Sequence, residues 1–180
     1  MPVIPYAPAD IREPADIVTA VRARRGGDLL HLDRMLLHSP PFALGWNSLL
    51  GAVRSGLALP ARLRELAICA VGALNGADYE IQQHAGPFRE AGGTDRQLEA
   101  LTDCDRAARD ATLFNQAERA VLGLTMAMTR HVHVSTELMA ATRAALRNDQ
   151  EIVELVGVIA TYNMVSRFLV ALGIEPEEET

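Results

Sequence analysis

The sequence predicts an all-α protein, a multi-helix bundle in a single domain that spans residues 1–180. Its hydrophobic content of 49% is ample for one continuous core, while its aromatic content of 4% favours helices packed through small aliphatic side chains. Apolar residues recur at helical spacing, and strand signals are scarce. Residues that open helices precede the apolar segments, and Gly or Asn-Gly follows them. Residues 1–13 and 174–180 lie outside these segments and are expected to be flexible.

Three helices are expected before residue 57. Gly26 and Gly27 follow two arginines that suit the negative end of a helix. Ser39 precedes two prolines and is pushed out of the helical region, which ends the second helix. A proline then starts the third. The expected bounds are Pro14 to Arg25, Asp28 to His38 with Asp28 as the cap, and Pro40 or Pro41 to Gly56.

The next two helices contain the candidate site residues. Pro60 opens a helix to Leu74 whose apolar residues share one face, and Asn75-Gly76 ends it. Another helix begins at Asp78, and Pro87 is expected to kink it.

Three further helix starts carry capping-box spacing or an Asn variant of it. The pairs are Thr94 with Gln97, Asn115 with Glu118, and Asn148 with Glu151. The last of these helices is expected to run to Leu172. His131 to Val134 is interpreted as a connector between two helical runs. Asp103 to Thr112 is left open as a charged loop or a short exposed helix.

Charge and composition exclude several function classes. The net charge is -6, there is no basic block, and the acidic tail Glu175 to Glu179 would repel phosphates, so no nucleic-acid partner is expected. The N-terminal residues show no signal-peptide pattern. No stretch reaches the roughly 18 uncharged apolar residues of a membrane span, since Leu155 to Val165 is short and contains Asn163. We therefore expect a cytoplasmic protein with no membrane contact.

Glu80 and His84 are four residues apart in one expected helix, so their side chains project from the same face. A carboxylate beside an imidazole orients the ring and favours its charged form, which suits proton transfer near neutral pH. An ordinary solvated Glu/His pair is the alternative. Glu65 lies in a mostly apolar helix and either faces the same site or forms a surface ion pair with Arg62 or Arg64.

The spacing of the cysteines and histidines gives little support for metal or thiol chemistry. Cys69 and Cys104 fit no CxxC or metal pattern and are interpreted as reduced structural thiols. The histidine pairs lack the carboxylate or cysteine that would complete a ligand set. Those pairs are His31 with His38 and His131 with His133. No metal is expected.

The run RLRELAICAVGALNGADYEIQQHAGPFREAGGTDRQLEAL, from Arg62 to Leu101, resembles the carboxymuconolactone decarboxylase and alkylhydroperoxidase D superfamily. Its recognisable parts are Arg64 to Ala67, Asn75, Tyr79-Glu80, His84 and Ala91-Gly92. More loosely, Tyr162-Asn163 and Ser166-Arg167-Phe168 are similar to the closing helix of the longer, peroxidase-related members.

The sequence departs from the pattern of the peroxidase branch at two positions that bear on function. The peroxidase branch has a Glu, then Cys-x-x-Cys, then a His four residues after the second cysteine. Glu65 and His84 match this pattern, but Ala77 and Glu80 occupy the cysteine positions. In the decarboxylase branch the residue four before the histidine is commonly Glu, as here.

The resemblance therefore implies a cofactor-free lyase, a decarboxylase that acts on a small acidic molecule. His84 would deliver the proton, Glu80 would orient the imidazole, Glu65 would relay a proton or hold water, and Arg62 or Arg64 would pair with a substrate carboxylate. A thiol-dependent, peroxidase-related oxidoreductase and a non-catalytic binding protein remain as alternatives. The family also implies a homotrimer or a hexamer of paired trimers.

Overall fold

The computed structural model describes residues 1–177, and among these residues it contains helices and no strand. The predicted all-α fold class is confirmed. The chain forms two compact units. Unit 1 comprises Met1–Gly56 together with the C-terminal segment from Leu169, and unit 2 comprises Leu57–Phe168. The expected single domain stays a prediction.

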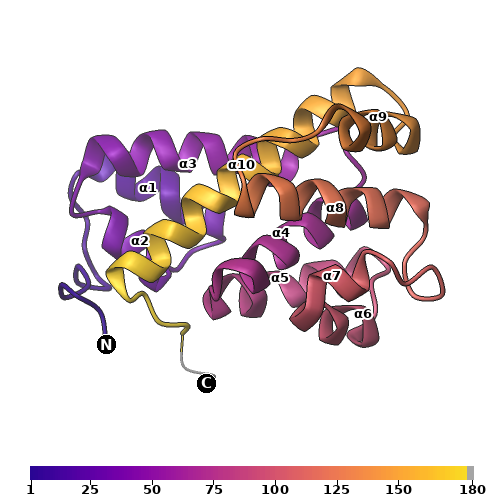
Figure 1. Cartoon of the computed structure of the whole chain (residues 1–180). Coiled ribbons are helices and arrows are strands. Elements are labelled where there is room, and N and C mark those ends of the chain that lie inside the picture. The colour runs from indigo at the N-terminus through magenta and orange to yellow at the C-terminus, as the bar shows by residue number, and fades with distance from the viewer. Residues whose placement is uncertain (178–180) are drawn as a thin grey trace. The chain divides into compact units, whose positions relative to one another are not determined.

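Unit 1 contains three helices from the N-terminal part of the chain and the end of the last helix (Figure 1). Its helices are α1 (Ala15–Arg25), α2 (His31–Leu36) and α3 (Pro40–Ser55). Helix α1 ends at Gly26 in the left-handed conformation, and α3 starts on Pro40. Both boundaries follow the sequence signals.

Helix α2 differs from the prediction, because it begins at His31 and not at Asp28. The Asp33 carboxylate accepts the backbone N–H of Leu30 at 3.0 Å, so the capping carboxylate comes from inside the helix. Asp33 is also the partner of two α1 arginines, a tertiary role that local spacing does not reveal.

The N-terminal segment forms hydrogen bonds within unit 1, and the expected flexibility of residues 1–13 stays a prediction. Val3 N–H donates to Leu172 O at 2.9 Å, and Arg34 Nε donates to Ala7 O at 2.6 Å. Ala7 is buried, as is Ile174 near the other end of the chain. The part of the C-terminal prediction that falls on residues 178–180 lies outside the described residues.

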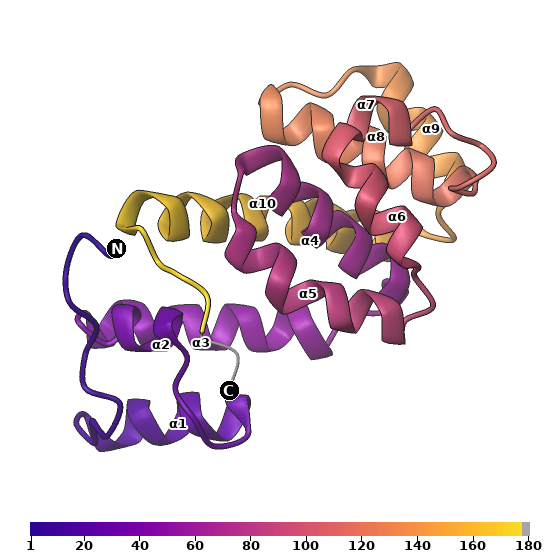
Figure 2. The same ribbon diagram turned by 90° about the horizontal axis from the view of Figure 1, so that it is seen from below.

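Unit 2 contains the remaining helices, and Figure 2 shows α4 and α5 lying side by side. Their bounds are α4 (Ala61–Asn75), α5 (Asp78–Glu90), α6 (Asp95–Ala100), η1 (Leu101–Asp103), α7 (Cys104–Ala107), α8 (Gln116–Arg130), α9 (Thr136–Ala145) and α10 (Asp149–Leu172), whose end belongs to unit 1. Thr94, Asn115 and Asn148 each accept the backbone N–H three residues on, as predicted. The uncertain stretch after Asp103 starts with the short helix α7.

Helix α4 is the centre of unit 2, since every residue from Leu66 to Val71 is fully buried. It packs against both α5 and α8. Close approach to α5 depends on Gly72, because a Cβ there would lie 3.2 Å from the Cβ of Glu80 and from Cγ1 of Ile81. This contact sets the spacing between the helices that carry Glu65 and His84.

Helix α10 is long and apolar enough to cross a membrane by length and composition, with a mean hydropathy of 1.7 in its most apolar window. Half of that window is buried within the structure, as in the core helix of many soluble proteins. Its buried residues include Leu155, Val158, Ile159 and Tyr162.

Candidate active site

Glu65 of α4 and His84 of α5 form a buried pair. Glu65 Oε2 lies 2.6 Å from His84 Nδ1, and the two residues are 3% and 4% exposed. The predicted association of these two residues is therefore present in the structure. The carboxylate that holds the imidazole comes from α4, however, and not from Glu80 one turn before the histidine.

Interactions with His84 and Arg64 keep Glu65 ionised. Burial raises the pKa of the Glu65 carboxyl, but the hydrogen bond and charge of His84, together with those of Arg64, outweigh it and lower the pKa below its usual value. Arg64 Nε donates to Glu65 Oε1 at 3.0 Å, so both carboxylate oxygens have partners. An ionised carboxylate only accepts hydrogen bonds, so Nδ1 of His84 carries the proton between them.

Tyr162 of α10 completes the arrangement from the other side of the ring. Its hydroxyl lies 3.1 Å from His84 Nε2, and the two rings meet edge to face at 5.0 Å between centroids. A neutral imidazole accepts the phenol proton at Nε2, whereas a charged imidazole donates to the phenol oxygen. Glu65, His84 and Tyr162 thus form a chain along which a proton can move.

Glu80 lies beside this chain but is bonded differently from the prediction. Its Oε2 lies 3.1 Å from Ser166 Oγ, and its Oε1 has no hydrogen-bond partner among the described residues. Burial raises the pKa of the Glu80 carboxyl to about 8, against the lowering effect of the Ser166 hydrogen bond. Glu80 is therefore a neutral acid at pH 7, and it does not orient the imidazole of His84.

Ser166 forms hydrogen bonds with residues of α4, α5 and α10. Its hydroxyl donates to Glu80 Oε2 at 3.1 Å and lies 2.5 Å from Tyr162 O, so these two acceptors share one proton. It accepts from Asn75 Nδ2 at 3.1 Å. With Oε2 accepting from Ser166, the proton of the neutral Glu80 carboxyl lies on Oε1.

Asn75 and Asn163 connect α4 to α10 next to Ser166. Asn75 Nδ2 donates to Asn163 Oδ1 at 3.2 Å, and Asn163 Nδ2 donates to Thr129 Oγ1 at 2.9 Å. Arg167 also donates to Asn163 Oδ1, at 2.7 Å. These bonds fix the position of the α10 segment that carries Tyr162.

Tyr162 and Ser166 are site residues that the sequence-based prediction of the site lacks. A usable signal was present, because Tyr162, Asn163 and Ser166 are polar residues at positions i, i+1 and i+4 of an otherwise apolar helix. Polar groups in a buried helix face need partners, so this spacing indicates a polar neighbour.

Arg62 does not lie at the candidate site, contrary to its predicted role in binding a substrate carboxylate. Its Nε donates to Glu118 Oε1 at 2.5 Å, and its other nitrogens donate to Gly92 O and to Gln97 Oε1. Arg62 thus ties α4 to α8 and to the turn between α5 and α6. Arg64 contacts Glu65 but is occupied by that ion pair.

Both cysteines are buried and poor nucleophiles. Burial, with the charges of Glu65 and Glu80, raises the pKa of the Cys69 thiol to about 12. Burial likewise raises the pKa of Cys104 to about 11, and its Sγ donates to Leu101 O. A thiol with such a pKa is almost entirely protonated at neutral pH.

The histidines considered for a metal have other contacts. His31 stacks on Tyr6 with ring centroids 4.4 Å apart, and His38 Nε2 lies 2.8 Å from Pro5 O. Within residues 1–177 there is no group of three or more His, Cys, Asp or Glu side chains arranged to hold a metal ion.

Residues 40–127 match the sequence model of the carboxymuconolactone decarboxylase family. The chain belongs to the carboxymuconolactone decarboxylase and alkylhydroperoxidase D-like superfamily. A comparison with curated proteins found no match to the sequence. Within the superfamily, Ala77 and Glu80 stand at the positions that carry cysteines in the peroxidase branch.

Several solved structures share the fold over nearly the whole chain. An uncharacterized peroxidase-related protein from Silicibacter sp. is 18% identical, with a TM-score of 0.78 over 98% of this chain and 91% of that one. A putative antioxidant defence protein AhpD from Agrobacterium tumefaciens is 22% identical, with a TM-score of 0.72 over 81% and 97%.

The debrominase Bmp8 is 14% identical, with a TM-score of 0.75 over 98% of this chain and 92% of that one. At these identities the likeness concerns the fold. The neighbours carry names for different chemistries, so the activity of this chain has to be argued from its own residues.

Proposed function

We propose that this superfamily member is a cofactor-free acid/base enzyme, a decarboxylase or related lyase that acts on a small organic carboxylate or lactone. The observation that carries the proposal is the hydrogen-bonded chain Glu65–His84–Tyr162, with distances of 2.6 Å and 3.1 Å at the two ring nitrogens. A carboxylate that fixes the tautomer of an imidazole whose other nitrogen meets a hydroxyl is a common proton-transfer arrangement.

Decarboxylation needs one proton and no redox partner. The bond between the carboxylate carbon and its neighbour breaks, the electron pair stays on the neighbouring carbon, and carbon dioxide leaves. The imidazolium of His84 then supplies a proton from Nε2, directly or through the Tyr162 hydroxyl, to form the new C–H bond. The imidazole regains a proton from solvent. Ionised Glu65 stabilises the imidazolium in its charged state.

Glu80 has a separate role in this proposal. As a neutral acid it has one proton, which Oε1, without a partner among the described residues, can donate to a carboxylate or enolate oxygen while Oε2 accepts from Ser166 Oγ. A donor of this kind stabilises negative charge as it develops, without adding a like charge that would repel an acidic substrate. Arg62 is left out of the substrate site, because its guanidinium is bound to Glu118.

A thiol-based peroxidase is the less favoured alternative. Some structural neighbours are named peroxidase-related, but this chain has Ala77 and Glu80 where the peroxidase branch has its cysteines. Cys69 is one turn beyond Glu65, and its pKa of about 12 leaves almost no thiolate.

A non-catalytic protein is the other alternative, and burial is the observation that favours it. Glu65, His84 and Tyr162 are all less than 5% exposed in the single chain. A structural network and a proton-transfer site predict different consequences of the same substitution. The structural network predicts a loss of stability of roughly 1–3 kcal/mol when a partner is removed. The proton-transfer site predicts a loss of turnover.

The test is carbon dioxide release from carboxymuconolactone and a panel of small unsaturated carboxylic acids. We expect His84→Gln and Glu65→Gln to reduce turnover by about 100-fold or more, which is typical of a lost general acid or base. Tyr162→Phe removes only the hydroxyl, so it separates direct donation by His84 from donation through Tyr162. Urea unfolding of each variant measures stability.

Two outcomes would count against the proposal. One is that no carboxylate in the panel is consumed while His84→Gln lowers the unfolding free energy, which would identify a structural network. The other is turnover that survives His84→Gln within a factor of a few, which would place the chemistry elsewhere.

A further inference from the structure

Three arginines gather around one pocket in unit 1, whereas the residues of the candidate active site belong to unit 2. The pocket has a volume of about 300 Å³ and is lined by Arg24 and Arg25 of α1 and by Leu50, Gly51, Arg54 and Ser55 of α3. None of these lining residues is acidic. The whole chain has a net charge of -6, so the positive charge around this pocket is opposite in sign to the net charge of the protein.

A single buried carboxylate holds two of the arginines in place. Asp33, whose side chain is 1% exposed, accepts from Arg24 Nη2 at 3.2 Å and from Arg25 Nε and Nη2 at 2.8 Å and 3.1 Å. Its Oδ2 also accepts the Leu30 backbone N–H. With these bonds the carboxylate is saturated, so its one negative charge faces two guanidinium groups.

Arg54 adds a third positive charge without a compensating partner. Within the part of the chain that the structure describes, the Arg54 guanidinium forms no ion pair or hydrogen bond. Arg24 is further fixed by its bond from Nε to Asn47 Oδ1 at 2.5 Å. The pocket therefore combines two guanidinium groups in fixed positions with one that is available to a ligand.

We propose that this pocket binds a small free oxyanion, a phosphate group or a multiply charged carboxylate. Guanidinium groups bind such oxygens through paired, charge-assisted hydrogen bonds, and several of them around one cavity suit a doubly charged anion. The proposal is independent of the proton-transfer chemistry at His84. An alternative reason for Arg54 is its favourable position in the last turn of α3, where a cation meets the negative end of the helix.

Gly51 offers a way to close the pocket without changing its charge. A Cβ added there would meet only Arg24 Cδ, at 3.9 Å, which is an ordinary contact. A larger side chain at this position would extend into the space that an anion needs, while improving the helix propensity of α3.

The experiment is isothermal titration of inorganic phosphate into the full chain at pH 7.5, with sodium chloride holding the ionic strength constant. We expect saturable binding at one site. Arg54→Gln should weaken the phosphate affinity by about tenfold, the loss expected for one charge-assisted contact. Arg54→Lys should keep part of the affinity, because it retains the charge but not the paired donors. Gly51→Leu should abolish binding.

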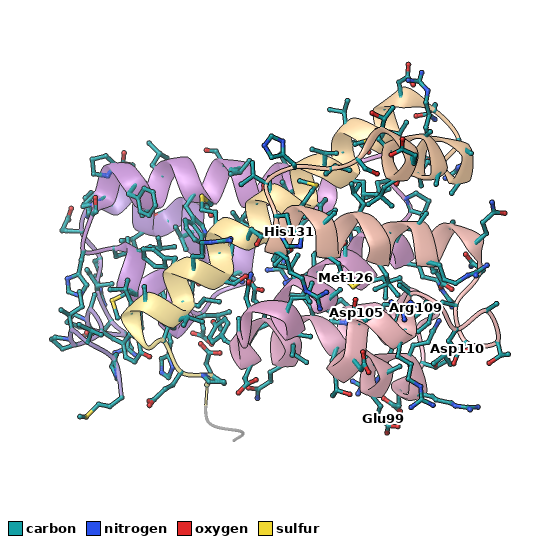
Figure 3. All side chains as sticks on the ribbon, viewed as in Figure 1. Glu99, Asp105, Arg109, Asp110, Met126 and His131 are labelled. Atoms are coloured by element: carbon teal, nitrogen blue, oxygen red, sulfur yellow. The ribbon has the colours of Figure 1, made fainter. Side chains whose placement is uncertain are left out.

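Arg109→Gln is the matched control, since it removes one positive charge from an exposed residue of unit 2. Figure 3 shows Arg109 near Asp105 and Asp110, and it does not line the pocket. The proposal is overturned if phosphate gives no saturable signal beyond that of chloride. It is equally overturned if Arg109→Gln weakens binding as much as Arg54→Gln, or if Arg54→Gln lowers thermal stability and leaves phosphate binding unchanged.

Discussion

Glu80 provides a sharp test of the site electrostatics, because its protonation should make the stability of the fold depend on pH. Burial raises the pKa of its carboxyl from the ordinary 4.5 to about 8. The substitution Glu80→Gln mimics the neutral acid in shape and keeps an oxygen that can accept from Ser166 Oγ. The variant therefore keeps the contacts of the protonated form and loses the ability to ionise.

The sign follows from the two protonation equilibria. In the unfolded chain the carboxyl loses its proton near pH 4.5, and in the folded protein it keeps the proton up to about pH 8. The stability linked to Glu80 is complete below pH 4.5 and is lost as the pH rises toward 8. A difference of one in pKa corresponds to about 1.4 kcal/mol. The difference between 4.5 and about 8 therefore means that ionisation of the buried carboxyl lowers the unfolding free energy by about 5 kcal/mol in total.

The assay is urea unfolding of wild type and Glu80→Gln at several values between pH 5 and pH 8. We expect the variant to gain stability relative to wild type by about 4 kcal/mol across this range. Glu99→Gln is the control, because it removes an exposed carboxylate from the same unit (Figure 3).

A stability difference that stays constant from pH 5 to pH 8 would show that Glu80 is already ionised in the folded protein. The neutral-acid assignment and the donor role of Glu80 in catalysis would then both be wrong. The carbon chemical shift of the Glu80 carboxyl in NMR reports the same protonation state directly.

Three further predictions concern the thiols, Arg62 and assembly. Peroxide consumption with thiol reductants should be negligible, because Cys69 is protonated; substantial turnover that disappears in Cys69→Ser would establish thiol chemistry. Arg62→Met should lower the unfolding free energy by roughly 1–3 kcal/mol, because buried Glu118 loses a partner, and should leave turnover unchanged; a selective loss of turnover would return Arg62 to the site. Light scattering should show a trimer or hexamer, since α10 exposes Val153 and Val170; a single 19.5 kDa species would contradict this.

Most helix boundaries could be predicted from the sequence because their causes are local. Thr94, Asn115 and Asn148 each cap the helix that follows them, through a side chain only three residues from its partner. Gly26 ends α1 in a backbone conformation that favours glycine. Helix α2 was misplaced because its cap, Asp33, is also the tertiary partner of Arg24 and Arg25.

For the two arginines near Glu65, sequence spacing does not predict which one contacts the Glu65 carboxylate. Arg62 and Arg64 lie two residues apart near the start of α4, and one or the other is expected to pair with a substrate carboxylate. The structure directs Arg62 to α8 and to the turn after α5, because Glu118 and Gly92 O offer it partners there. Arg64 alone reaches Glu65. The partners are more than 25 residues away in sequence from Arg62, so nothing local distinguishes the two side chains.

Contacts between residues distant in sequence also explain why Glu65, and not Glu80, is the carboxylate that bonds to His84. The i, i+4 spacing places Glu80 and His84 on one face of α5. The Glu80 carboxyl nevertheless bonds to Ser166, while the His84 imidazole bonds to Glu65. Gly72 makes this possible, because the missing side chain lets α4 approach α5 at the level of Glu80. Glu65 then accepts hydrogen bonds from His84 and Arg64 and stays charged, whereas Glu80 accepts, among the described residues, only from the Ser166 hydroxyl and holds its proton. Two glutamates of opposite protonation state beside one histidine are what an enzyme needs to stabilise an imidazolium and a developing anion together. The pH dependence of the Glu80 variant therefore tests the feature on which the proposed chemistry depends most.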